Sequence, residues 1–160
     1  AVEMYFDAVE SGKYECFVDR NTRLPMMFMD DAIRATLELM DAPLESLNYH
    51  SNYNLSSMSF SAEELEKEIS AHVDFSCLYK PDYRQDIADT WPVSINDDDA
   101  RKDWGWEPKF DISKMTEEMI TNLRRLNVSS PTNWMKKEYN DLVKKGFDWK
   151  PPVILSLIHI

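Results

Sequence analysis

Three consecutive carboxylates at positions 97–99 are the most conspicuous candidate for a metal site in this sequence. Acidic residues directly before a helix commonly cap it or place solvated charge at the positive end of its dipole. The spaced ligands and central glycine of a calcium loop do not occur here, and His50, His72 and His159 lack the spacing of zinc ligands. We therefore predict that the chain has no metal site.

Two cysteines could supply a nucleophile or a disulfide. Cys16 and Cys77 have no histidine beside them, form no C-x-x-C motif, and each fall within an apolar stretch typical of a strand. We predict that both are small buried residues without a chemical role. So few cysteines fit a reducing compartment, which is the cytoplasm or, in a eukaryote, the mitochondrial matrix.

A methionine cluster and one arginine are the candidates for binding a small molecule. Met26, Met27 and Met29 precede a predicted helix, where they either belong to the core or border a pocket. Arg84 lies in the run DYRQDIAD, in a loop bounded by prolines. Its planar, permanently charged fork suits either an acidic neighbour or the carboxylate of a ligand. The pattern leaves both interpretations open.

The composition narrows the class of protein and of partner. With 43% apolar and 12% aromatic residues, the chain of 160 residues has enough apolar content for a folded core. Its net charge of -11 repels phosphate backbones and anionic lipids. We therefore expect no nucleic-acid partner and no membrane partner.

Apolar spacing predicts alternating helices and strands. Strands are expected at residues 14–18, 53–57 and 75–79. Helices are expected at residues 2–9 and 100–104, and a further helix begins at 30 or 31 and ends before Pro43. Two more helices are expected to begin near residues 61 and 111. In the second helix, which Asp30 or Asp31 would cap, Ile33, Leu37 and Met40 share one side.

Two helix starts carry explicit capping signals. Ser61 and Glu64 form a capping box, and Phe60 with Leu65 forms a hydrophobic staple around it. Asp111 is placed to cap the last helix of the core. The alternating elements indicate an α/β fold of mixed helices and short strands. No strand is followed by a glycine-rich turn, so we expect the chain to contain no dinucleotide-binding domain.

The apolar pattern also predicts domain boundaries. We expect one domain over residues 1–126, a linker at 127–133, and an amphipathic helix with a tail, or the start of another domain, at 134–160. Residues 155–160 resemble the read-through of a sequencing adapter and are candidates for a non-native end. Helical spacing already begins at residue 1, so we expect an upstream half to be missing.

Several segments resemble the C-terminal substrate-binding portion of extended short-chain dehydrogenase/reductases. The landmarks are FMDDAIRA at 28–35, YNL at 53–55 and ARKDWGWEP at 100–108. Within that superfamily, longer runs at 1–9, 14–17, 22–29 and 84–92 are similar to the L-threonine dehydrogenases. The resemblance covers residues 1 to about 124.

This resemblance implies an enzyme that oxidises the β-carbon hydroxyl of L-threonine, with NAD as the acceptor, to give 2-amino-3-ketobutyrate. The catalytic tyrosine and lysine and the NAD site would lie in the upstream half, so we expect no catalytic residue in this chain. Arg84, Met26 and Trp91 are the expected substrate contacts. The resemblance also implies that the full-length enzyme is a homodimer.

Two other functions remain as alternatives. A nucleotide-sugar epimerase or dehydratase of the same fold would carry an arginine that clamps the substrate diphosphate, but Leu24 stands at that place. A leucine cannot bind phosphate, which disfavours this alternative. The second alternative is a non-catalytic binding module.

Overall fold

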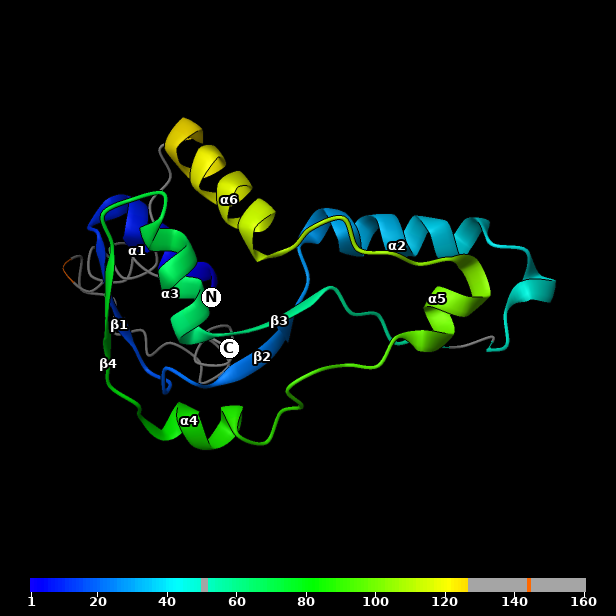
Figure 1. Ribbon diagram of the computed structural model, residues 1–160, viewed down its shortest axis with the longest axis horizontal. Helices are drawn as coiled ribbons and strands as arrows, with labels where there is room; N and C mark the ends of the chain where they lie inside the picture. Colours follow the sequence, from blue (N-terminus) through cyan, green and yellow to red (C-terminus); the bar gives the residue numbers. More distant parts are fainter. Residues whose placement is uncertain (50–51, 127–143, 145–160) are drawn as a thin grey trace. The chain divides into compact units, whose positions relative to one another are not determined.

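The computed structural model describes residues 1–49, 52–126 and 144. Backbone contacts divide the chain into two units, residues 1–127 and 128–160. All the elements named below belong to the first unit (Figure 1). The predicted linker at 127–133, the predicted tail helix apart from residue 144, and the stretch 155–160 lie outside the described residues.

The main hydrophobic core lies where three helices meet a pair of parallel strands. Helices α1 (Val2–Glu10), α3 (Ala62–Ser70) and α6 (Ile112–Leu126) contact one another, while α1 contacts strand β1 (Lys13–Cys16) and α3 contacts β4 (Ser76–Tyr79). Buried core residues come from the three helices, from β1 and from two positions outside these elements, while Cys77 and Tyr79 of β4 are partly buried against them. The buried residues are Met4, Tyr5, Ala8, Tyr14, Cys16, Phe60, Leu65, Ile69, Phe75, Met115, Ile120 and Leu123.

Strands β1 and β4 pair in parallel, from Lys13 opposite Ser76 to Cys16 opposite Tyr79. The turn before β1 requires glycine, because Gly12 has a φ of 69° and a Cβ there would lie 2.7 Å from the Asp74 carbonyl oxygen. Alternating burial along β4 confirms the strand predicted at 75–79.

A second strand pair is antiparallel and leads to the substrate candidates. Strand β2 (Arg23–Met26) pairs with β3 (Met58–Ser61). The strand predicted at 53–57 is wrong, because these residues have no regular secondary structure and β3 begins at Met58. Side chains hold this segment instead: the Trp106 Nε1 donates to the Ser56 carbonyl at 3.1 Å, and the Tyr53 hydroxyl donates to Asp103.

Helix α2 (Met29–Asp41) forms where predicted, but its N-cap differs from the prediction. Neither Asp30 nor Asp31 caps it, since its N-cap residue is Phe28, which makes no side-chain cap. Asp31 is fully buried and accepts hydrogen bonds from the backbone N–H groups of Lys109 and Phe110. The side of Ile33, Leu37 and Met40 is exposed, whereas Asp31 and Ala35 face inward.

Ala35 belongs to a second hydrophobic cluster, with Ala100 and Trp106. Ala100 lies in α5 (Asp98–Trp104), which ends at Gly105 in the left-handed conformation with a φ of 74°. Asp97, the residue before α5, makes no side-chain cap; its carboxylate instead binds Arg101 at 2.8 Å and 3.1 Å. The capping role expected for this acidic run is therefore wrong for Asp97.

Two predicted helix starts are confirmed, and two short helices were not predicted. Ser61 accepts from the Glu64 N–H at 3.2 Å while Glu64 accepts from the Ser61 N–H at 2.9 Å, which completes the capping box of α3. Asp111 accepts from the Lys114 N–H at 2.8 Å at the start of α6. The additional helices are α4 (Tyr83–Ala88) and the 3-10 turn η1 (Leu44–Ser46).

Candidate functional site

Arg84 lies in the first turn of α4 and is held by its own neighbour. Asp82 is the N-cap of this helix and accepts from the Arg84 N–H at 2.9 Å. The same carboxylate receives the Arg84 guanidinium, with Nη2 2.6 Å from Oδ2 and Nε 3.0 Å from Oδ1. Of the two sequence interpretations of Arg84, pairing with an acidic neighbour is therefore present in the structure.

The guanidinium also stacks on an aromatic ring. The Arg84 Cζ lies 3.5 Å from the centroid of Phe17, which follows β1. The hydrogen bonds from Arg84 hold the pKa of the Asp82 carboxyl below its usual value, and the carboxylate in turn raises the pKa of Arg84. The pair therefore stays fully ionised at neutral pH and fixes the fork on the face of Phe17.

Gln85 fixes α4 to the loop after β1. Its Oε1 accepts from the Asp19 N–H at 2.7 Å and its Nε2 donates to the Thr22 hydroxyl at 2.9 Å and to Asp89 at 2.6 Å. This positioning role of Gln85 was not predicted from the sequence. The Asp-x-x-Gln spacing of residues 82 and 85 could have indicated it, because an aspartate cap at Asp82 starts the turn that contains Gln85.

Met26 and Phe17 line one small cavity beside the main core. Its other lining residues include Tyr14, Leu24 and Leu65, and its volume is about 50 Å³. Ligand pockets are generally about 300–1,000 Å³, so this cavity could admit a few waters at most and not a metabolite. Met26 and Arg84 thus approach the same region through Phe17, but the described residues do not enclose a substrate there.

Trp91 lies apart from this cavity. It follows α4, its backbone N–H donates to the Ala88 carbonyl at 3.1 Å, and 42% of the residue is exposed. Three neighbouring apolar residues are also exposed: Tyr83 at 65%, Val93 at 60% and Ile87 at 37%. The structure therefore brings Arg84 and Met26 to one region and leaves Trp91 on an open apolar surface.

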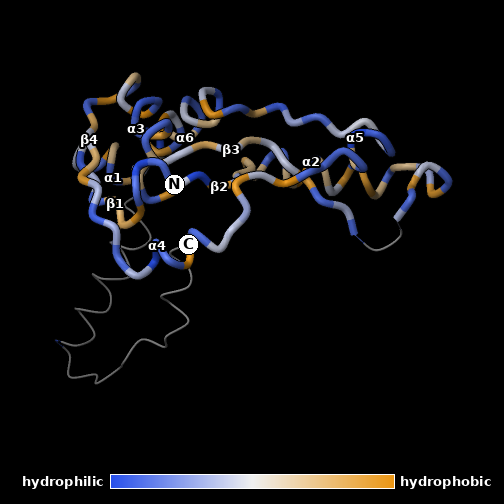
Figure 2. The backbone as a smooth tube through the Cα atoms, turned by 60° about the horizontal axis from the view of Figure 1, so that its bottom comes forward, coloured by the Kyte–Doolittle hydropathy of each residue, from blue (hydrophilic) through white to orange (hydrophobic). Residues whose placement is uncertain are grey.

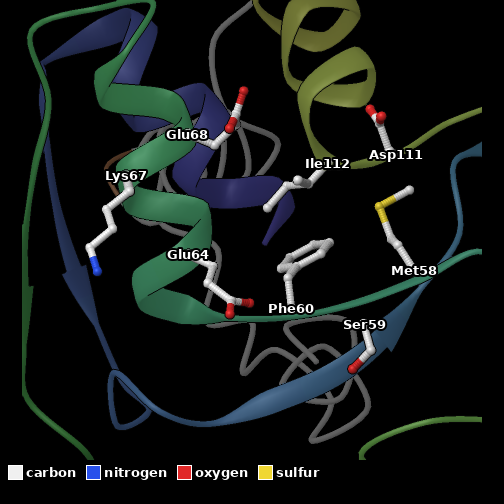
Figure 3. Close-up of a pocket in the computed structure, with 8 residues that line it drawn as sticks. All are labelled: Met58, Ser59, Phe60, Glu64, Lys67, Glu68, Asp111 and Ile112. Carbon is white, nitrogen blue, oxygen red and sulfur yellow. The ribbon is translucent and has the colours of Figure 1, made fainter.

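A larger hollow of about 600 Å³ opens elsewhere, between β3, α3 and the start of α6 (Figure 3). Phe60, Ile112 and Met58 form its apolar part, and carboxylates stand at its edge. These carboxylates already have partners: Glu64 binds Arg23 at 2.5 Å, and Asp111 caps α6. The hollow contains none of the predicted site residues.

Neither the cysteines nor the described carboxylates form a reactive or metal-binding cluster. Burial raises the pKa of Cys77 to about 12 and also raises that of Cys16, so both stay protonated at neutral pH. Within the described residues, no group of three or more potential ligands could hold a metal ion. No helix in that same part of the chain is both long and apolar enough to cross a membrane.

Comparison with known proteins finds solved L-threonine dehydrogenases that are similar to this chain. No protein-family model matches the chain. A solved monomeric L-threonine 3-dehydrogenase from a metagenome is 96% identical, with a TM-score of 0.75, over 79% of this chain and 41% of its own. The GalE-like L-threonine dehydrogenase of Cupriavidus necator is 43% identical, with a TM-score of 0.73, over 76% of this chain and 44% of its own.

Curated relatives include dehydrogenases and proteins named as epimerases. The mitochondrial L-threonine 3-dehydrogenase of Bos taurus is 48% identical over 75% of this chain and 32% of its own length. An uncharacterized epimerase/dehydratase of Staphylococcus haemolyticus is 45% identical over 75% of this chain and 38% of its own. The chain thus spans about a third of the length of these curated relatives.

Proposed function

Because this chain is homologous to part of the L-threonine 3-dehydrogenases, we propose that it forms the substrate-recognition part of an NAD-dependent enzyme that oxidises L-threonine to 2-amino-3-ketobutyrate. The observation that carries this proposal is the 96% identity to a solved L-threonine 3-dehydrogenase over 79% of the chain. The mixed α/β fold, with short strand pairs flanked by helices, is the fold of the solved neighbours.

NAD would be bound by the part of the enzyme that this chain does not span. A dinucleotide fold needs several glycines in one turn, so that the backbone can approach the pyrophosphate. Among the described residues, Gly12 and Gly105 serve two separate single turns. The described residues therefore do not fit a pyrophosphate site, and we propose that they contribute no step that acts on the cofactor.

The proton-accepting group would also come from outside this chain. A tyrosine that acts as a base needs a lowered pKa. Burial instead raises the pKa of Tyr5 to about 12, and Tyr5 shares a hydrogen bond of 2.8 Å with Thr116 in the core. Burial raises the pKa of Tyr14 as well. These tyrosines are core residues, which supports a catalytic tyrosine and lysine in the remainder of the enzyme.

Within this chain, Arg84 is our candidate for the threonine carboxylate, and Met26 and Trp91 are the candidate apolar contacts. The Arg84 fork holds the Asp82 carboxylate, and a substrate carboxylate would have to replace or share that partner. Closure of the full enzyme over this region would exclude water from the reacting carbon.

The proposed partner is the small-molecule substrate, without nucleic acid or membrane. The expected homodimer stays a prediction. The relative that is 96% identical is described as monomeric, which favours a monomer for the full-length form of this chain. Of the two expected compartments, the cytoplasm and the mitochondrial matrix, the mitochondrial relative supports the matrix.

A second candidate function, nucleotide-sugar epimerisation or dehydration, is supported by the relatives named as epimerase/dehydratases. Leu24 argues against it, because it pairs with Phe60 across β2 and β3 and offers no donor to a diphosphate. The neighbouring Arg23 is occupied by the Ser59 carbonyl and by Glu64, each at 2.5 Å.

A full-length chimera tests the proposal. Residues 1–126 of this chain replace the matching part of the 96% identical relative, and NADH formation is followed with L-threonine, with D-threonine as the control substrate. We expect the chimera to form NADH with L-threonine but not with D-threonine. In calorimetric titration, we expect the 160-residue chain by itself not to bind NAD. An active epimerase with UDP-sugars that fails to oxidise threonine would refute the proposal.

A further inference from the structure

Asp82 occupies only one edge of the Arg84 guanidinium. Its carboxylate accepts from Nε at 3.0 Å and from Nη2 at 2.6 Å, which are the two nitrogens of the side edge. A guanidinium has five N–H donors, and this pairing uses two of them. The other three N–H groups, on Nη1 and Nη2, have no hydrogen-bond partner among the described residues. They form the end edge, which can bind a second carboxylate through two parallel bonds.

Phe17 and the backbone fix the orientation of that end edge. The Arg84 Cζ lies 3.5 Å from the Phe17 ring centroid, so the ring supports one face of the guanidinium. The Asp82 N–H donates to the Phe17 carbonyl at 3.1 Å, which ties the two supports of Arg84 to each other. The Arg84 side chain is 27% exposed, so the described residues hold it without enclosing it.

Other acidic residues near Arg84 leave the guanidinium to Asp82. Asp86 and Asp89 follow in the same helix, but neither binds Arg84 in the described part of the chain. Asp89 instead accepts from the Gln85 Nε2 at 2.6 Å. The chain is hydrophilic from the end of β4 into α4 (Figure 2), which suits a polar ligand. The end edge of Arg84 therefore has no competing carboxylate among the described residues.

We propose that Asp82 is a positioning residue for threonine oxidation. It holds Arg84 by the side edge, so that the end edge binds the substrate carboxylate while Asp82 stays in place. This inference rests on the proposed function, in which Arg84 contacts the threonine carboxylate. An arginine that is already held loses less rotational freedom when it binds a ligand. Asp82 therefore strengthens the binding of threonine without touching it.

The opposite role for Asp82 is that of an internal competitor, which the substrate carboxylate would have to displace. Displacement would exchange two charge-assisted hydrogen bonds for two others, whereas binding at the end edge keeps both pairs. The two roles predict opposite effects on KM. Removing the Asp82 carboxylate would lower the KM for threonine if Asp82 competes, and it raises that KM if Asp82 positions Arg84.

The test measures Asp82→Ser in the full-length chimera. Serine keeps an N-cap acceptor for α4 but is too short to hold the Arg84 guanidinium. We expect the KM for L-threonine to rise about two- to tenfold, which corresponds to freeing one long side chain. The kcat and the KM for NAD should stay within about twofold of the unmodified chimera. Glu15→Ser is the matched control, since it removes an equal charge from a pair with Lys80 and should leave all three constants unchanged.

L-threonine amide distinguishes positioning of a carboxylate contact from a general loss of structure. Its carboxamide is neutral, so its inhibition constant as a competitor of L-threonine should change by less than about twofold in Asp82→Ser. A lower or unchanged KM for L-threonine would overturn the proposal. So would an equal weakening of L-threonine and its amide.

Phe17→Leu provides a second variant should Asp82→Ser fail to fold. Leucine keeps an apolar side chain and the backbone carbonyl but removes the ring face under Arg84, so the KM for L-threonine should rise here too. An unchanged KM in Phe17→Leu would then overturn the proposal. Arg84→Lys separates the two levels of the argument. If it raises the KM for L-threonine while Asp82→Ser does not, the proposed contact stands and this inference fails; if Arg84→Lys has no effect, both fail.

Discussion

Asp31 offers the sharpest test of how the first unit is held together. Its carboxylate accepts from the N–H groups of Lys109 and Phe110, at 3.0 Å each, and from the Arg34 Nη2 at 2.8 Å. Arg34 in turn stacks on Trp106, with its Cζ 4.6 Å from the ring centroid. One buried side chain thus joins α2 to the segment before α6. We expect Asp31→Ala to destabilise the protein strongly.

The magnitude follows from the partners that would be left behind. Removing one member of a buried ion pair lowers the free energy of unfolding by about 3–5 kcal/mol. We take this range to include the loss of the acceptor by the two backbone N–H groups, which costs about 1–3 kcal/mol for each donor. At roughly 4 °C per kcal/mol for a domain of this size, Asp31→Ala should lower the Tm by about 12–20 °C. Asp30→Ala is the matched control, because Asp30 is exposed and should change the free energy of unfolding by less than about 1 kcal/mol.

The pH dependence gives the same residue a second signature. Burial alone would raise the pKa of Asp31, but the hydrogen bonds from Arg34 and the two backbone N–H groups outweigh it, so the pKa lies below the usual 3.8. The charged form therefore contributes stability above the unfolded pKa and loses it as the pH falls through the folded pKa. Urea unfolding should be measured for the wild type and Asp31→Asn from pH 7 to pH 2. The difference between their free energies of unfolding should narrow only below about pH 4. A difference in the free energy of unfolding that does not depend on pH would refute this reasoning. So would the finding that Asp30→Ala and Asp31→Ala are equally stable.

Three further predictions concern the cap, the thiols and the site. Ser61→Ala should lower the free energy of unfolding by about 1 kcal/mol in calorimetry, and Ser61→Asp, which keeps an acceptor, should restore most of it; no loss in the alanine variant would contradict the capping role. An aromatic disulfide reagent at pH 8 should modify Cys16 and Cys77 at least about 100-fold more slowly in the native chain than in urea, since burial raises the pKa of Cys77 to about 12. In the chimera, Arg84→Lys should raise KM for threonine far more than KM for NAD, because lysine keeps the charge but loses the fork; unchanged KM values would leave Arg84 with a structural role beside Asp82.

Local signals in the sequence predicted the starts of α3 and α6. The capping box of Ser61 and Glu64 and the cap by Asp111 each join residues three positions apart, so a short stretch of sequence contains both partners. The function of Asp31 could not be predicted in this way, because its backbone partners are 78 and 79 positions away. Nothing in the residues near Asp31 distinguishes a buried acceptor from a cap.

Helix α2 and the candidate site show what apolar spacing leaves undetermined. Ile33, Leu37 and Met40 correctly indicated a helix, but apolar spacing does not say which layer a helix side meets. Helix α4 was missed because six residues are too few for helical spacing to repeat. Without that helix, the sequence also could not predict that Asp82 caps α4 and binds Arg84. The choice between Asp82 and a ligand as the partner of Arg84 therefore stayed open.

The bond between Tyr5 and Thr116 has a consequence for synthesis of the protein. The two residues are 111 positions apart, and α1 packs against α6 as well as β1. At about 5–20 residues per second, a ribosome needs roughly 6–22 s to make the intervening chain. During that interval Met4, Tyr5 and Ala8 have left or are leaving the exit tunnel while their α6 partners do not yet exist. The apolar side of α1 therefore lacks its α6 partner during that interval, and its native packing is completed only after α6 has emerged.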